Sequence, residues 1–170
     1  ELLDLKFLFI KGVPSRDVIS VENIFPFGYY DSHYGYTYTY GALSNNTVLT
    51  EKQIVIDPNA SGYKLKAIIS GHGHEGPHHC CEWVSKSHSY IINGLKMFTW
   101  NVWKDCGNNP IYPQGGTWPY DRAGWCPGTK VDEYSFELTN LVNLGDTISI
   151  DYEIETMVDE SEEKGIFRMS

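Results

Sequence analysis

The sequence predicts an all-β domain, either a sandwich or a barrel, with about eight antiparallel strands. Three observations favour this class. Short stretches of strand length recur at regular spacing along the 170 residues. No long stretch shows the 3.6-residue periodicity of an amphipathic helix. Aromatic residues make up 14% of the chain, and aromatic side chains are enriched in strands.

The expected strands can be assigned in order. The apolar run from Leu5 to Ile10 is the first. Tyr34–Tyr40 has tyrosine at every second position, so a strand there would place four rings on one face. Lys52–Ile56 is short and ends before Asp57-Pro58. The remaining expected strands are Tyr63–Ser70, Ser89–Ile92, Met97–Val102, Glu133–Leu138 and Thr147–Ile154. Asn93-Gly94 between two of them is a strong signal for a two-residue hairpin turn.

Composition excludes several classes of protein. A length of 170 residues suits one domain with its own core. The net charge of −9 argues against nucleic acid as a partner, because a phosphate-binding face should be basic. No stretch approaches the ~20 apolar residues of a membrane-spanning helix. No signal peptide is visible, so we expect a mature chain or a fragment.

Asp105–Gly128 is the most unusual segment, because its 24 residues include four prolines, five glycines and two tryptophans. Proline excludes a continuous helix here. We expect an ordered surface loop closed by a Cys106–Cys126 disulfide. Closing a loop of about 20 residues contributes roughly 3 kcal/mol. A disulfide also implies an oxidising compartment, so we expect a secreted or periplasmic protein.

Several motifs in this segment and upstream of it resemble one known family. Near the start of the loop stands Asn109-Pro110, and its end reads D-R-A-G-W-C-P-G. Upstream lie I-S-G-H-G-H-E-G, C-C-E-W and S-H-S-Y-I-I-N, beginning at Ile69, Cys80 and Ser87. In order, spacing and chemistry these motifs resemble the C-terminal half of the peptide-N-glycosidase F family, bacterial amidases that remove whole N-linked glycans from asparagine. The resemblance is specific over Leu65–Gly128 and weaker over most of the chain.

The resemblance implies a jelly-roll β-sandwich. Residues 1–170 would form a single jelly-roll domain like the family's C-terminal domain. The family's N-terminal domain, which carries its principal catalytic aspartate, would be absent from this chain. The family also continues with a last apolar strand beyond the position of Gly165–Ser170. We therefore expect part of a two-domain hydrolase that is inactive by itself. Its expected partners are an N-glycosylated peptide or protein and the missing domain, and no cofactor is implied.

The same resemblance indicates candidate site residues. Glu82 in C-C-E-W and Arg122 in D-R-A-G-W match family positions, and we expect both to take part in catalysis. Asp121 could be the local partner of Arg122. The expected substrate-binding residues are His72, His74, Trp83, Trp118 and Asp121. Trp125 is expected in the core beside the disulfide.

Cys80 and Cys81 depart from the family pattern. The family pairs the first of these positions with a cysteine four residues later, where this chain has Val84. A Cys80–Cys81 disulfide between neighbours is an alternative but would be strained, and we expect two free thiols.

Two other functions remain open. The domain could be a carbohydrate- or protein-binding module without catalysis. Alternatively, His72 stands where the family has tryptophan, and His72 with His74 has a spacing that suits a transition metal held by imidazoles. A jelly-roll domain resembling the copper-dependent monooxygenases is therefore the third hypothesis, although their methionine ligand has no counterpart here.

Overall fold

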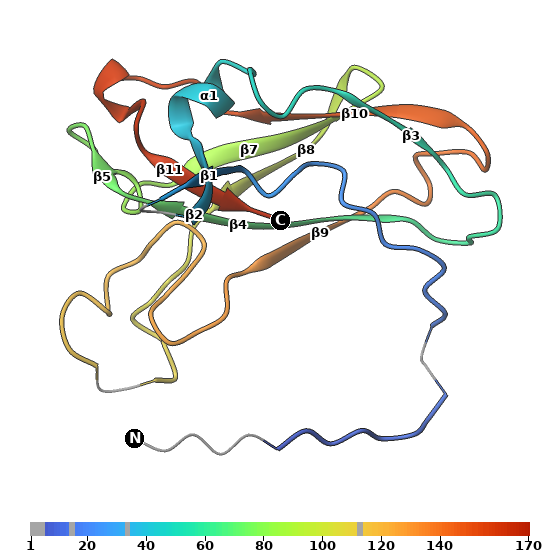
Figure 1. Ribbon diagram of the computed structural model, residues 1–170, viewed down its shortest axis with the longest axis horizontal. Coiled ribbons are helices and arrows are strands. Elements are labelled where there is room, and N and C mark those ends of the chain that lie inside the picture. Colours follow the sequence, from blue (N-terminus) through green and yellow to red (C-terminus); the bar gives the residue numbers. More distant parts are fainter. Residues whose placement is uncertain (1–5, 14–15, 33–34, 112–113) are drawn as a thin grey trace.

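Two antiparallel β-sheets pack face to face in a computed structural model that describes residues 6–13, 16–32, 35–111 and 114–170 (Figure 1). The first sheet has five strands in the order β1 (Tyr29–Asp31), β2 (Gly35–Thr39), β11 (Ile166–Met169), β4 (Lys64–His72) and β9 (Glu133–Glu137). The second has four in the order β3 (Lys52–Val55), β10 (Thr147–Ile154), β7 (Lys86–Ile92) and β8 (Leu95–Val102). A two-stranded ribbon joins β5 (His74–Glu75) to β6 (Cys80–Cys81). Two short helices are α1 (Tyr40–Ser44) and the 3-10 turn η1 (Glu160–Glu162).

The core lies between the two sheets and follows the period-2 alternation of side chains along a strand. In β10, every second side chain is at most 3% exposed: Ile148, Ile150, Tyr152 and Ile154. In β4, the inward residues are Leu65, Ala67 and Ile69. This arrangement confirms the predicted all-β, jelly-roll-like sandwich.

Two local predictions are confirmed in detail. Thr147–Ile154 forms β10 with the predicted bounds. Asn93-Gly94 joins β7 to β8, and both residues have positive φ, 50° and 75°. These angles suit the two-residue hairpin turn that an Asn-Gly pair favours.

The prediction of a first strand at Leu5–Ile10 is wrong over its described part. Leu5 lies outside the described residues, whereas Lys6–Ile10 has no regular secondary structure. Phe9 is 96% exposed. An apolar run forms a strand only when a neighbouring strand pairs with it.

The alternating tyrosines give a shorter strand than predicted. Tyr34 lies outside the described residues, and β2 ends at Thr39. The Thr39 side chain accepts a hydrogen bond from the Ala42 backbone N–H and caps α1, so Tyr40 begins a helix. Tyr38 is buried, whereas Tyr36 near the sheet edge is 61% exposed.

The C-terminal segment forms an interior strand. β11 lies between β2 and β4 and buries Ile166 and Phe167. The further strand expected from the resemblance stays a prediction. No helix within the described ranges is both long and apolar enough to cross a membrane.

Candidate functional site

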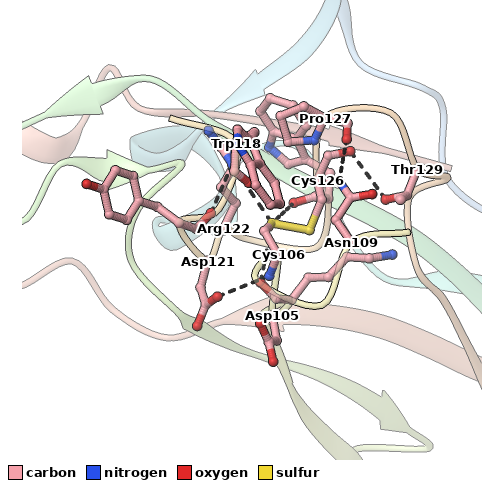
Figure 2. Close-up of a disulfide and its surroundings, with 12 residues drawn as sticks. Asp105, Cys106, Asn109, Trp118, Asp121, Arg122, Cys126, Pro127 and Thr129 are labelled. Carbon is pink, nitrogen blue, oxygen red and sulfur yellow. Dashed lines mark hydrogen bonds between the residues drawn. A yellow bond between two sulfur atoms is a disulfide. The ribbon is translucent and has the colours of Figure 1, made fainter. Parts of the chain in front are cut away.

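The loop that follows β8 is closed at its base as predicted. Cys106 and Cys126 form a disulfide (Figure 2). Beside it, Lys104 and Arg122 exchange backbone hydrogen bonds of 2.8 and 3.1 Å. The loop extends from one end of the sandwich, drawn yellow to orange in Figure 1.

The end of this loop docks onto β4 through small residues. The Gly71 N–H donates to the Ala123 carbonyl (3.0 Å), and the Trp125 indole N–H donates to the Gly71 carbonyl (3.0 Å). Gly124 has φ +78°, and a Cβ there would lie 2.3 Å from the Ile69 carbonyl oxygen. The Ala-Gly-Trp sequence therefore lets the loop backbone lie directly against the strand.

Arg122 uses its whole guanidinium group inside the protein. Nε donates to Glu82 Oε1 at 3.0 Å. Nη1 donates to the carbonyls of Tyr120 (2.9 Å) and Trp118 (3.5 Å). Nη2 donates to the carbonyl and hydroxyl oxygens of Thr117, at 2.8 and 2.9 Å. The side chain is 2% exposed, so Arg122 fastens the loop to Glu82 rather than projecting into solvent.

Two indole rings lie against this guanidinium. Arg122 Cζ lies 4.3 Å from the centroid of the Trp83 ring and 5.1 Å from that of Trp125. The His72 ring packs on Trp125 with the ring centroids 5.2 Å apart. The Tyr120 and Trp83 ring centroids are 6.4 Å apart. Cation–π contacts stabilise such an arrangement and fix the plane of the guanidinium.

Glu82 follows β6 directly, and its Oε1 accepts the bond from Arg122. Its side chain is 15% exposed. Oε2 lies 3.8 Å from His74 Nε2, beyond hydrogen-bond distance. His74 Nε2 instead accepts the Trp83 indole N–H at 3.2 Å.

An aromatic depression of about 400 Å³ opens beside this group and is lined by His74, His79, Trp83, Thr117 and Tyr120. Hydroxyl, imidazole and indole groups around an apolar floor suit a polar ligand with an apolar face. His79 and Tyr120 were not predicted. Tyr120 adjoins the D-R-A-G-W motif and His79 adjoins Cys80, but proximity in sequence does not show that both line one depression.

Comparison with known proteins identifies the family. Residues 39–170 match the family described as Peptide-N-glycosidase F, C terminal. The chain belongs to this family. Peptide-N(4)-(N-acetyl-beta-D-glucosaminyl)asparagine amidase F of Elizabethkingia miricola is 34% identical over 122 residues, covering 65% of this chain and 33% of that protein. The chain thus spans about a third of the length of this curated relative.

Solved structures agree. The structure of PNGase F, described as a glycosylasparaginase from Flavobacterium meningosepticum, has a TM-score of 0.66 and 30% identity, covering 72% of this chain and 42% of that one. PNGF-II has a TM-score of 0.54 at 24% identity, covering 71% of this chain and 23% of that one, and it shows the fold alone.

The residues expected from the peptide-N-glycosidase F resemblance fall into two groups. Glu82, Arg122, Trp83 and His74 come together as one cluster. Asp121 lies at the loop base, where Oδ1 accepts the Cys106 backbone N–H at 3.1 Å. The described ion pair of Arg122 is with Glu82, not with its sequence neighbour. Trp118 is half-buried, and its carbonyl oxygen accepts from Arg122.

His72 has separate surroundings. Its Nε2 lies 2.9 Å from Ser70 Oγ, and its ring packs on Trp125. Burial, and secondarily the positive charge of Arg168, lowers the pKa of His72 to about 4. It borders a second depression of about 500 Å³ on the outer face of the first sheet.

Nothing in the described residues favours the metal hypothesis. β4 ends at His72, and Gly73 turns the chain with φ +97° before His74 begins β5. The two imidazoles therefore contact different neighbours. Within the described ranges, no three His, Cys, Asp or Glu side chains are grouped as a metal would require.

The prediction of free thiols at Cys80 and Cys81 is wrong. The two cysteines are joined in a disulfide across a cis peptide bond, and both are fully buried. Gly165 leaves the space beside them, because a Cβ there would lie 2.7 Å from Cys81 Sγ. The prediction rested on the missing partner cysteine at Val84 and on the expected strain of a bond between neighbours, and it did not include the glycine that packs on the pair.

Proposed function

We propose that this chain is the C-terminal part of a peptide-N4-(N-acetyl-β-glucosaminyl)asparagine amidase, which hydrolyses the amide joining an N-linked glycan to asparagine. Family membership supports this, as does the 34% identity to an amidase of that name. The observation that carries the proposal is Glu82, held on Arg122 at 3.0 Å beside an aromatic depression.

Glu82 is the residue of this chain that we propose to contact the substrate. With Oε1 on Arg122, Oε2 can accept a hydrogen bond from a sugar hydroxyl or from the substrate amide N–H. Trp83 supplies a ring on which the apolar face of a sugar can pack. His74 borders the same depression. Roles for His72, Trp118 and Asp121 in substrate binding stay predictions.

Arg122 is proposed to act through Glu82. Its N–H groups already donate to Glu82 and to the loop. A direct bond from Arg122 to the substrate carbonyl would require one of these to break. We therefore assign Arg122 to positioning, and we expect polarisation of the carbonyl oxygen to come from the other domain.

The proposed reaction needs water and the glycosylated asparagine. Water adds to the side-chain amide carbon, the carbon–nitrogen bond breaks, and the products are aspartate and a glycosylamine. The resemblance assigns the carboxylate that handles the water to the N-terminal domain. The chain alone is therefore expected to release no glycan.

An activity assay tests this proposal. The chain alone should leave a glycopeptide intact. A chimera with the N-terminal domain of the Elizabethkingia miricola amidase should release the glycan and convert asparagine to aspartate, as mass spectrometry would show. In the chimera, Glu82→Gln should lower kcat at least about 100-fold. The exposed Glu153→Gln on β10 is the matched control and should change little. Glycan release by the chain alone, or full activity of Glu82→Gln, would contradict the proposal.

We also propose that the protein works in the periplasm or outside a bacterial cell. Its four cysteines form two disulfides, which persist in oxidising compartments.

A further inference from the structure

The Cys80–Cys81 pair lies between two glycines, with its sulfurs against Gly165 and the Cys81 carbonyl against Gly71. A Cβ at Gly165 would lie 2.7 Å from Cys81 Sγ and 3.1 Å from Cys80 Sγ. A Cβ at Gly71 would lie 1.9 Å from the Cys81 carbonyl oxygen. The bonded pair therefore fits between β4 and the turn before β11, in a space that a larger side chain at Gly71 or Gly165 would not leave.

This bridge is next to two polar residues of the candidate site, His74 and Glu82. β6 pairs with β5, with His74 opposite Cys81. Glu82 is the next residue, and its N–H donates to the Gly73 carbonyl at 3.3 Å. The Glu82 carbonyl in turn accepts the Ala123 N–H at 2.9 Å. The ribbon that carries His74 and Glu82 thus has its buried side at the disulfide and its exposed side at the depression.

We propose that the Cys80–Cys81 bridge positions Glu82. Because the two cysteines pack as one covalent unit, they fix the position of β6 relative to β4. Glu82, the next residue, then has its Oε1 within hydrogen-bond distance of Arg122 Nε. Without the bridge, the two cysteine side chains can rotate independently. The hydrogen bond between Glu82 and Arg122 then loses its fixed geometry. The consequence for hydrolysis rests on the proposed function, whereas the positioning itself can be measured on this chain.

The first measurement is the number of thiols in the denatured chain. We expect none without reductant, and two free thiols per chain would overturn the proposal. The second is hydrogen exchange of the Arg122 Nε–H by NMR, because this proton reports the bond to Glu82. In Cys80→Ser/Cys81→Ser, it should exchange at least about tenfold faster, while the backbone amides of β7 and β10 keep their protection. Unchanged exchange of this proton would overturn the proposal.

If the Cys80→Ser/Cys81→Ser variant does not fold, a second variant still tests the proposal. Gly165→Ala keeps the bridge but directs a Cβ at both sulfurs, and Gly115→Ala, which meets no atom within 4 Å, is its matched control. Gly165→Ala should speed exchange of the Arg122 Nε–H, again without change in β10, and the control should not. If both cysteine and glycine variants lose the whole fold, the bridge holds the domain rather than Glu82, and the positioning role is wrong. In the chimera, the cysteine variant should lower kcat more than it changes KM.

Discussion

Arg122 combines two tasks that sequence motifs do not separate. Its guanidinium bonds the carbonyls of a proline- and glycine-rich loop and also pairs with Glu82, which comes from a different part of the chain. Guanidinium has five N–H donors in one plane, and lysine could not reproduce this geometry. The same residue therefore folds the loop and orients the carboxylate.

Removing this guanidinium should destabilise the domain. We expect Arg122→Met to lower the free energy of unfolding by about 3 kcal/mol, because it leaves Glu82 and several loop carbonyls without a donor. Lys96→Met is the control, since Lys96 and Glu153 are each 50% exposed and their 2.8 Å pair should contribute less than about 1 kcal/mol. Urea unfolding measures both. An equal effect of the two substitutions would show that Arg122 is not the clamp of the loop.

A second residue-scale prediction concerns His88 in the core. Its side chain is fully buried, with Nδ1 2.5 Å from the Tyr152 hydroxyl. Burial lowers the pKa of His88 to about 3, against about 6.5 in an unfolded chain. The unfolded state therefore binds the proton first, and stability falls as the pH drops from about 6.5 towards 3. One proton contributes a slope of up to about 1.4 kcal/mol per pH unit.

Urea unfolding across this range, compared with His88→Gln, isolates that proton. In the variant, the slope of the unfolding free energy against pH should be smaller by the contribution of one proton. Imidazole ¹⁵N shifts of the wild type should show a neutral ring at pH 5. A His88 ring that is charged at pH 5 in the folded protein would contradict the prediction.

At the scale of elements, β4 is the support on which the site is assembled. The D-R-A-G-W segment bonds to its backbone at Gly71, and β6 passes so close that Gly71 has no room for a side chain. Three elements separated in sequence thus meet at one glycine.

Gly71→Ala should therefore be severe. Its Cβ would lie 1.9 Å from the Cys81 carbonyl oxygen and 2.8 Å from the Ala123 side chain. We expect a loss of at least about 3 kcal/mol, since the Cys81 backbone and the packed Ala123 side chain leave no room for the added carbon. Gly115→Ala should change stability by less than about 0.5 kcal/mol. Thermal and urea unfolding measure the difference, and a Gly71→Ala domain as stable as the control would mean that β6 does not pack there.

The elements also show which features local patterns can predict. The alternation of apolar residues predicted β10 with its bounds, and Asn93-Gly94 predicted the turn between β7 and β8. Both signals depend only on residues close in sequence. The Tyr34–Tyr40 pattern missed α1, because the Thr39 cap overrides the alternation. For the site, the motifs predicted Glu82 and Arg122, but not how Arg122 distributes its donors. That distribution depends on the folded path of the loop.

At the scale of the whole molecule, the described residues 6–13 and 16–21 contribute little to the sandwich. Their exposed apolar side chains are Phe7, Leu8, Phe9, Ile10, Val13, Val18, Ile19 and Val21, at 54–97% exposure. Packing against the core begins with the partly buried Ile24 and Phe25. Figure 1 shows residues 6–13, in dark blue, lying apart from the two sheets.

Deleting residues 1–20 should therefore leave the stability of the domain nearly unchanged. We expect the free energy of unfolding to shift by less than about 1 kcal/mol, because the described residues of this segment, 6–13 and 16–20, are exposed and lie in neither sheet. Self-association should decrease, since exposed apolar side chains in succession promote it. Phe25→Ala in the full chain is the control, and it should cost about 1–2 kcal/mol through lost burial. Urea unfolding and sedimentation velocity test both effects. A truncated chain that loses more stability than Phe25→Ala would show that the first 20 residues belong to the folded domain.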